Sequence, residues 1–97
     1  MGRTLTVSRV SVRPGAEAEY LAAVNELARL AEARGWHLWV FRAPDRTGTF
    51  LECSESRSRE THRVMAARPE DEQRLEQRIR AVAEYADGAW ELWEEVR

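Results

Sequence analysis

The order in which hydrophobic periodicity changes along this chain constrains its fold more than any other feature. Residues 4–12 alternate as a strand does, with apolar side chains on both parities. Over residues 16–35 the apolar side chains recur at steps of three and four, which is typical of an amphipathic helix. Aromatic and β-branched runs at 36–42 and 49–55 flank a turn-rich segment, and this arrangement predicts a hairpin.

A second helical region and a last strand are predicted after the hairpin. Residues 56–68 are polar and suit only a short helix, whereas Pro69 and the acidic residues after it predict the start of a longer one. Asp87–Gly88 predicts the end of that helix, and residues 90–96 a closing strand. The buried stripe of the longer helix is predicted to be Leu75, Ile79, Val82 and Ala86. We therefore expect an α+β, ferredoxin-like β-α-β-β-α-β fold, with a four-stranded antiparallel sheet and its helices on one face.

Size and composition favour one domain that pairs with a second copy. A chain of 97 residues with 43% hydrophobic content fits a single domain over residues 1–97. Such a short chain buries a modest share of its surface, so association with a second copy is a natural way to bury more. Cys53 is the only cysteine and the chain starts without an apolar leader, so we expect a cytoplasmic protein without disulfides. No apolar stretch approaches the ~18 residues of a membrane span.

The charges argue against nucleic acid as a partner. The chain carries 15 basic and 17 acidic residues for a net charge of −2, and the two signs are interleaved. A phosphate backbone requires clustered basic residues, which are missing here. Every basic residue is an arginine, so a side-chain Schiff base, which needs a lysine amine, is excluded.

Strand parity predicts two unlike faces for the sheet. We assign one parity to the helix side, namely Trp36, Leu38, Val40, Leu51, Cys53, Trp90, Leu92 and Val96. The other parity collects His37, Trp39, Phe41, Phe50, Glu52, Glu91, Trp93 and Glu95. Contiguous exposed apolar patches of this kind usually mark an interface or a ligand site. We therefore expect this second face to be the surface through which two copies form a homodimer.

The start of the chain resembles a known group of proteins. Val10 to Gly15, followed by Tyr20 and an amphipathic helix that ends at Gly35, resembles the opening of the antibiotic-biosynthesis monooxygenase-like proteins, which are dimeric α/β barrels. The resemblance in element order extends over essentially the whole chain. It implies a homodimer whose two sheets form a barrel, and an activity like that of the group, which includes cofactor-independent oxygenases of aromatic polyketides and quinols.

Haem degradation, another activity of that group, is disfavoured by the residues. The haem-degrading members use an asparagine on the first strand, a tryptophan after the third strand and a histidine on the next helix. The first strand here has no asparagine, and Ser56 stands near the tryptophan position. Met65 falls near the histidine position, with His62 one turn earlier.

The candidate site residues lie on the predicted dimer face. His37 is the candidate general base, and the alternative is an interface histidine that is hydrogen-bonded to Glu52 or Glu91. His62 is expected to face solvent. The candidate substrate-binding residues are Trp39, Phe41, Phe50, Glu52, Trp93 and Arg9. The aromatic members would stack on a flat substrate, and the alternative is that they only pack across the interface.

Neither a metal nor a bound cofactor is predicted. His37 and His62 lack the spacing of metal ligands, and Cys53 is expected to be a buried, unreactive thiol on the helix side.

Two functions remain open at this stage. The first is a homodimer that binds a small, flat aromatic or apolar molecule, as a cofactor-independent monooxygenase or isomerase. The second is a non-catalytic interaction module whose aromatic face only joins two chains. A vacant cavity with His37 or Arg9 pointing into it would favour the first. A face fully covered by its mate, without a second pocket between helices and sheet, would favour the second.

Overall fold

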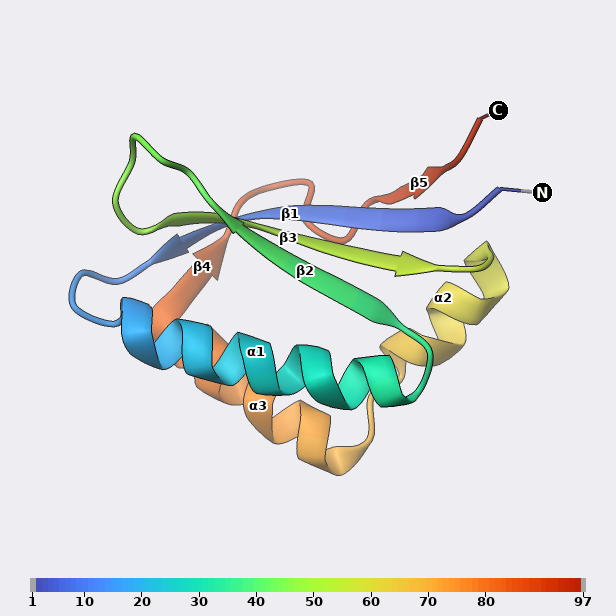
Figure 1. Ribbon diagram of the computed structural model, residues 1–97, viewed down its shortest axis with the longest axis horizontal. Helices are drawn as coiled ribbons and strands as arrows, with labels where there is room; N and C mark the ends of the chain where they lie inside the picture. The colour runs from blue at the N-terminus through green and yellow to red at the C-terminus, as the bar shows by residue number, and fades with distance from the viewer. Residues whose placement is uncertain (1, 97) are drawn as a thin grey trace.

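The computed structural model describes residues 2–96 and confirms the α+β, ferredoxin-like fold (Figure 1). The elements in chain order are β1 (Thr4–Val12), α1 (Glu17–Ala33), β2 (His37–Arg42), β3 (Thr49–Ser56), α2 (Arg59–Ala66), α3 (Glu70–Val82), β4 (Ala83–Tyr85) and β5 (Leu92–Glu94). The second helical region is divided at Pro69, as the sequence predicted. Two short strands follow α3: β4, directly after the helix, and β5, within the predicted last strand.

The sheet is antiparallel and has one covered face. Its strand order is β2-β3-β1-β4. Strand β5 also pairs with β1, at the Thr4–Thr6 end, whereas β4 pairs with the Val10–Val12 end. Helices α1 and α3 lie under the sheet and α2 lies at one end of it, while no helix covers the opposite side (Figure 1). We call the uncovered side, formed by Leu5, Val7, Trp39, Phe41, Leu51 and Trp93, the open face. Within residues 2–96, no helix is long and apolar enough to cross a membrane.

Local sequence signals explain where the helices begin and end. Gly35 has a φ of 90°, a left-handed conformation that glycine adopts without strain, and it terminates α1. The side chain of Ser58 accepts a hydrogen bond from the Thr61 amide at 3.1 Å and caps α2. Pro69 precedes α3, whose first turn carries three acidic residues that favour the positive end of the helix dipole.

The prediction that α3 runs to Ala86 was wrong. The helix ends at Val82, and the next three residues form β4, which pairs with β1. The carbonyl of Val82 accepts a hydrogen bond from the Arg13 amide at 2.8 Å, and the Ala86 amide donates to the Arg9 carbonyl at 3.0 Å. Ladder bonds to β1 therefore replace the helical bonds that the periodicity alone suggested.

The closing strand is also shorter than predicted. Instead of the full segment 90–96, only Leu92–Glu94 pairs with β1. Residues 86–91 loop away from the sheet between β4 and β5 (Figure 1). Trp90 in this loop has a φ of 67°, which is rare for a bulky residue and has to be held by its surroundings.

The predicted side-chain directions on β3 were wrong by one residue. Phe50 pairs with Val10 and Glu52 with Ser8, so both point to the helix side, where they are buried. Leu51 and Cys53 point to the open face instead. A shift of one residue exchanges every side chain of a strand between the two faces, which is why the error moved all four residues together.

The covered face of the sheet changes character along its length. At one end Val10, Val12 and Phe50 pack against α1 and α3 and form the hydrophobic core. At the other end the helix-facing positions hold small polar residues, such as Thr6 paired with Ser54. Short polar side chains cannot fill the space up to the helices, so a hollow is left beside the core.

Candidate functional site

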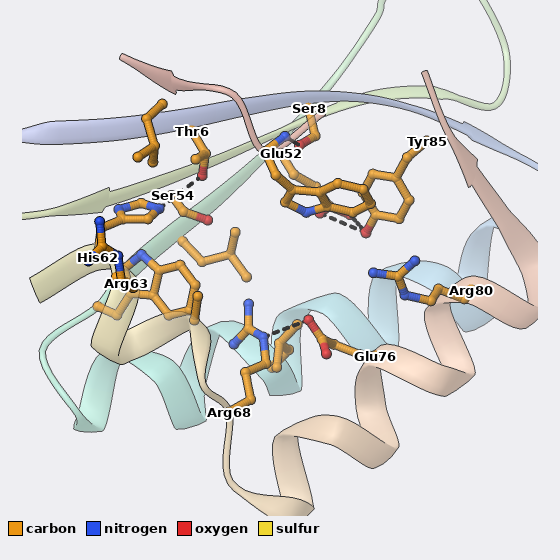
Figure 2. A pocket seen from close by; sticks show the side chains of 16 residues that line it. Thr6, Ser8, Glu52, Ser54, His62, Arg63, Arg68, Glu76, Arg80 and Tyr85 are labelled. Carbon is orange, nitrogen blue, oxygen red and sulfur yellow. Dashed lines mark hydrogen bonds and ion pairs between the residues drawn. The ribbon is translucent and has the colours of Figure 1, made fainter. Parts of the chain in front are cut away.

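A cavity of about 450 Å³ occupies this hollow, between the covered face of the sheet and the three helices (Figure 2). Its size falls within the range of small-molecule sites. The polar lining residues are Thr6, Ser8, Glu52, Ser54, His62, Arg63, Arg68, Glu76 and Arg80. The apolar and aromatic ones are Leu27, Trp36, Leu38, Ala66, Tyr85, Trp90 and Leu92.

His62 on α2 is a buried imidazole at one end of the cavity. Its side chain is 4% exposed, so the expectation that it faces solvent was wrong. The Ser56 hydroxyl donates to the Ser58 carbonyl at 3.2 Å and lies 2.8 Å from His62 Nδ1, which therefore carries the proton and donates to Ser56. Nε2, 3.3 Å from the Thr6 hydroxyl, is left as the acceptor (Figure 2).

The surroundings of His62 favour a neutral ring. Burial lowers the pKa of His62, and the positive charge of Arg68 lowers it further. Trp36 packs edge-on against the imidazole with 5.1 Å between ring centroids. Near neutral pH the unprotonated Nε2 is therefore a base, and the Thr6 hydroxyl that donates to it, itself in the cavity wall, is the group through which a proton from a bound molecule would reach it.

Glu52 on β3 is a buried carboxylate held by two phenols. The Tyr20 hydroxyl donates to it at 2.6 Å, and the Tyr85 hydroxyl donates at 2.9 and 3.0 Å to its two oxygens. Burial raises the pKa of Glu52, and the hydrogen bonds from Tyr20 and Tyr85 only partly offset that rise. Burial, together with the negative charge of Glu52, raises the pKa of both tyrosines. The group therefore fixes the Tyr85 ring in the cavity wall.

Aromatic rings line two sides of the cavity. Tyr85 and Trp90 lie against each other, with ring centroids 4.8 Å apart. The loop between β4 and β5 delivers Trp90 to this place, and the Trp90 amide donates to the Ser8 hydroxyl at 3.4 Å. Across the cavity Trp36 is 5% exposed, and its buried indole nitrogen has no hydrogen-bond partner among residues 2–96.

A network of ion pairs closes the floor between α1, α2 and α3. Glu72, whose side chain is 1% exposed, lies 2.7 Å from both Arg34 and Arg68. Arg68 also lies 2.7 Å from Glu76, and its guanidinium covers the Trp36 ring at 4.5 Å. The network fixes the Arg68 side chain beside Trp36 at the cavity wall.

The predicted site residues are split between the two faces of the sheet. Glu52 lines the cavity and Phe50 lies in the core, so both were wrongly placed on the dimer face. His37, Trp39, Phe41, Trp93 and Arg9 do lie on the uncovered side of the sheet. The cavity lies on the opposite side, so the structure does not bring these five residues into it.

His37 and Cys53 both lie in surroundings that differ from those predicted. His37 is exposed and stacks on Trp39, with 6.0 Å between ring centroids and Glu32 at 3.5 Å from its Nδ1. Its carboxylate neighbour is thus neither of the two that were considered. Cys53 is partly buried on the open face rather than buried on the helix side, and burial raises the pKa of its thiol.

Sequence reasoning missed most of the cavity residues. The signal available was the run of small polar residues at alternate positions, in particular Thr4, Thr6 and Ser8 on β1. Their parity matches that of Val10, so a hydrophilic stretch on the helix-facing side was visible before the fold was known. His62 and Trp90 gave no such signal, because the burial of His62 depends on the packing of α2 and the position of Trp90 depends on the loop between β4 and β5.

No group of three or more histidine, cysteine, aspartate or glutamate side chains gathers as a metal site would among residues 2–96. The donor set of the cavity is a single imidazole, two carboxylates and several hydroxyls. This set suits proton transfer and hydrogen bonding.

Comparison with known proteins identifies the fold. No family model matches the chain, and no curated protein sequence matches it. The structure is similar to that of a variant of SnoaB, a cofactor-independent oxygenase from Streptomyces nogalater, with a TM-score of 0.81 and 18% identity over 100% of this chain and 96% of that one. A candidate antibiotic biosynthesis monooxygenase from Nitrosomonas europaea gives 0.80 at 8% identity, covering 99% and 93% of the two chains.

A third similar structure is a candidate antibiotic biosynthesis monooxygenase from Bordetella bronchiseptica. Its TM-score is 0.73 at 20% identity, and the match covers 100% of this chain and 98% of that one. Because these matches extend over nearly full lengths on both sides, this chain has the fold of the antibiotic-biosynthesis monooxygenase-like proteins, as the resemblance of its opening implied.

Proposed function

We propose that this chain is a cofactor-independent monooxygenase that acts on a flat aromatic substrate in the cavity beneath the sheet. The observation that carries the proposal is the buried His62, whose unprotonated Nε2 is hydrogen-bonded to Thr6 in the wall of a cavity that is also lined by aromatic rings. The shared fold with an oxygenase of this kind supports it. A cavity between helices and sheet supports this function over the pure interaction module, although it is lined by His62 rather than by His37 or Arg9 as the sequence suggested.

The proposed reaction uses the substrate as its own reductant. His62 removes a proton from a phenolic or activated carbon acid, and the resulting electron-rich ring reduces O₂. One oxygen atom is incorporated at a ring carbon that loses two hydrogens, and the other leaves as water. The ring pair Tyr85 and Trp90 orients the substrate plane.

The homodimer is part of the same proposal. Three large rings of the open face remain exposed in one copy, with Trp39 at 46%, Phe41 at 55% and Trp93 at 56%. A second copy that packs on this face would bury them and leave the cavity, on the other side of the sheet, accessible. In this arrangement the open-face aromatics serve assembly and the cavity serves the substrate.

The test is oxygen consumption with a panel of phenols and quinols, together with incorporation of isotopically labelled O₂ into the product. Wild type should accelerate uptake above the spontaneous rate and incorporate one labelled atom. His62→Gln should lower kcat by about 100-fold or more, the usual effect of losing a general base. His37→Gln, a matched change outside the cavity, should leave kcat unaltered. Conversion without label would instead indicate an isomerase, and equal loss in both variants would contradict the assignment of His62.

A further inference from the structure

We infer that the substrate carries a negatively charged arm that binds Arg80, and this inference rests on the proposed function only in taking the cavity as the ligand site. Arg80 on α3 lines the cavity at the end opposite His62, and its guanidinium points inward below Tyr85 (Figure 2). It lies over two aromatic rings, 5.7 Å from the centroid of Tyr85 and 5.0 Å from that of Trp90. The guanidinium is exposed and lies at the edge of the aromatic wall.

The charge balance around the cavity leaves Arg80 without a carboxylate. Arg34 and Arg68 are neutralised by Glu72 and Glu76 within the network described above. Glu76 lies one helical turn before Arg80, yet its carboxylate is bound to Arg68. Among residues 2–96, Arg80 makes no ion pair within 4 Å. A guanidinium whose N–H groups are not bound to a carboxylate can bind a carboxylate or phosphate of a ligand.

A second hollow shows where such an arm would lie. An outer groove of about 470 Å³ runs along the junction of α2 and α3. It shares four lining residues with the cavity, namely Ala66, Arg68, Glu76 and Arg80. Gln73 and Gln77 complete the polar wall of the groove. Arg80 therefore stands at the passage from an aromatic chamber to a polar one.

This geometry assigns two parts to the ligand. A flat ring system occupies the cavity between Trp36 and the Tyr85–Trp90 pair, and a short arm passes Arg68 and ends in an oxyanion at Arg80. A neutral arm of equal size would leave the guanidinium without an acceptor. Arg80 is accordingly a specificity-determining residue that selects charged over neutral substrates.

The experiment measures binding by isothermal titration calorimetry with two matched probes, 1-naphthaleneacetate and the uncharged 1-naphthaleneacetamide. Wild type should bind the acetate about tenfold more tightly than the amide, since hydrogen bonds to charged groups are about twice as strong as neutral ones. Arg80→Gln should bring the two Kd values within about twofold by weakening the acetate alone. Arg80→Lys, which keeps the charge, should retain part of the preference. 1-Naphthyl phosphate, as a third probe, distinguishes a carboxylate site from a phosphate site.

Arg78→Gln is the control, because it removes one exposed positive charge from the same helix outside both hollows. It should leave the preference intact. Equal binding of both naphthalene probes by wild type, or an unchanged preference in Arg80→Gln, would overturn the inference. Neither result touches the oxygenase proposal, which is decided by oxygen incorporation with uncharged phenols. Conversely, a charge preference that depends on Arg80 would stand even if no oxygenation were found.

Discussion

Individual polar residues of the cavity are held by buried partners rather than by solvent. His62 is held by Ser56 and Thr6, and Glu52 by two tyrosines, so neither side chain can turn freely toward a ligand. Fixing a reactive group before the substrate arrives removes an entropic cost from the reaction. The same burial sets the protonation states, since it opposes charge on both the imidazole and the carboxyl group.

Glu52 gives a pH-dependent prediction at this scale. Burial raises the pKa of Glu52 above its ordinary value of 4.5. At a pH between 4.5 and the raised pKa of the folded state, Glu52 is ionised in the unfolded chain but protonated in the folded one. Rising pH therefore favours unfolding in this range. Glu52→Gln lacks this effect. The unfolding free energy of wild type minus that of Glu52→Gln should therefore fall as the pH rises above the ordinary pKa of 4.5.

Urea unfolding at a series of pH values measures this difference. Glu84→Gln, at an exposed position of β4, controls for the change in net charge. A difference that grows with pH would mean that the hydrogen bonds from Tyr20 and Tyr85 stabilise the carboxylate more than burial opposes it.

At the scale of elements, the end of α1, the turn between α2 and α3 and the first turn of α3 meet at the floor of the cavity. Arg34 caps the end of α1 and Arg68 lies in the turn between α2 and α3, and both bind Glu72 on α3. This clamp holds α2, which makes few other contacts with the body of the domain, against the sheet. The position of His62 in the cavity consequently depends on a carboxylate that does not line it.

Glu72→Gln tests the clamp. Burial raises the pKa of Glu72, but the hydrogen bonds and charges of Arg34 and Arg68 outweigh it, so the pKa is lowered overall and the carboxylate is charged near neutral pH. Its removal takes the carboxylate away from Arg34 and leaves the buried guanidinium of Arg68 with Glu76 alone. We expect a loss of about 3 kcal/mol in the free energy of unfolding, as for other buried ion pairs that lose one member.

Thermal and urea unfolding near neutral pH would measure that loss. Glu70→Gln is the matched control on the same helix, because its pairing with Arg74 is exposed on both sides and should contribute little. A loss no larger than that of the control would show that the clamp does not hold the helices together.

Element order and most helix limits could be predicted from the sequence, because periodicity, Gly35 and Pro69 act locally. The direction of side chains on β3 could not, since Phe50 and Leu51 are both hydrophobic and either parity of that strand looks buried. The pairing of Glu52 with Ser8 decided it, and that is a long-range property of the sheet. Strand β4 could not be predicted for the same reason. Ala83 to Tyr85 continue the helical periodicity, and only their pairing with β1 makes them a strand.

At the scale of the whole molecule, the sheet separates two surfaces that differ in composition, and the proposed function gives each a different task. The covered face forms the core at one end and the cavity at the other, while the open face presents aromatic side chains with no element over them (Figure 1). A patch of this kind is costly to leave in water, and burying it against a second copy recovers about 25 cal/mol for each Å². Assembly and catalysis could therefore change independently.

Trp39→Arg separates the two surfaces by experiment. Trp39 lies in the middle of the open face, beside Cys53 on the next strand, and a guanidinium there would have to be buried without a partner in the proposed dimer. Sedimentation velocity should find wild type as a dimer and Trp39→Arg as a monomer at micromolar concentration. Val64→Arg makes a matched change at an exposed position of α2 and should remain a dimer. A monomeric wild type, or a dimeric Trp39→Arg, would rule out the open face as the interface. Because the cavity lies on the other side of the sheet, the monomer should still bind naphthalene probes, and loss of binding on dissociation would mean that the second copy shapes the site.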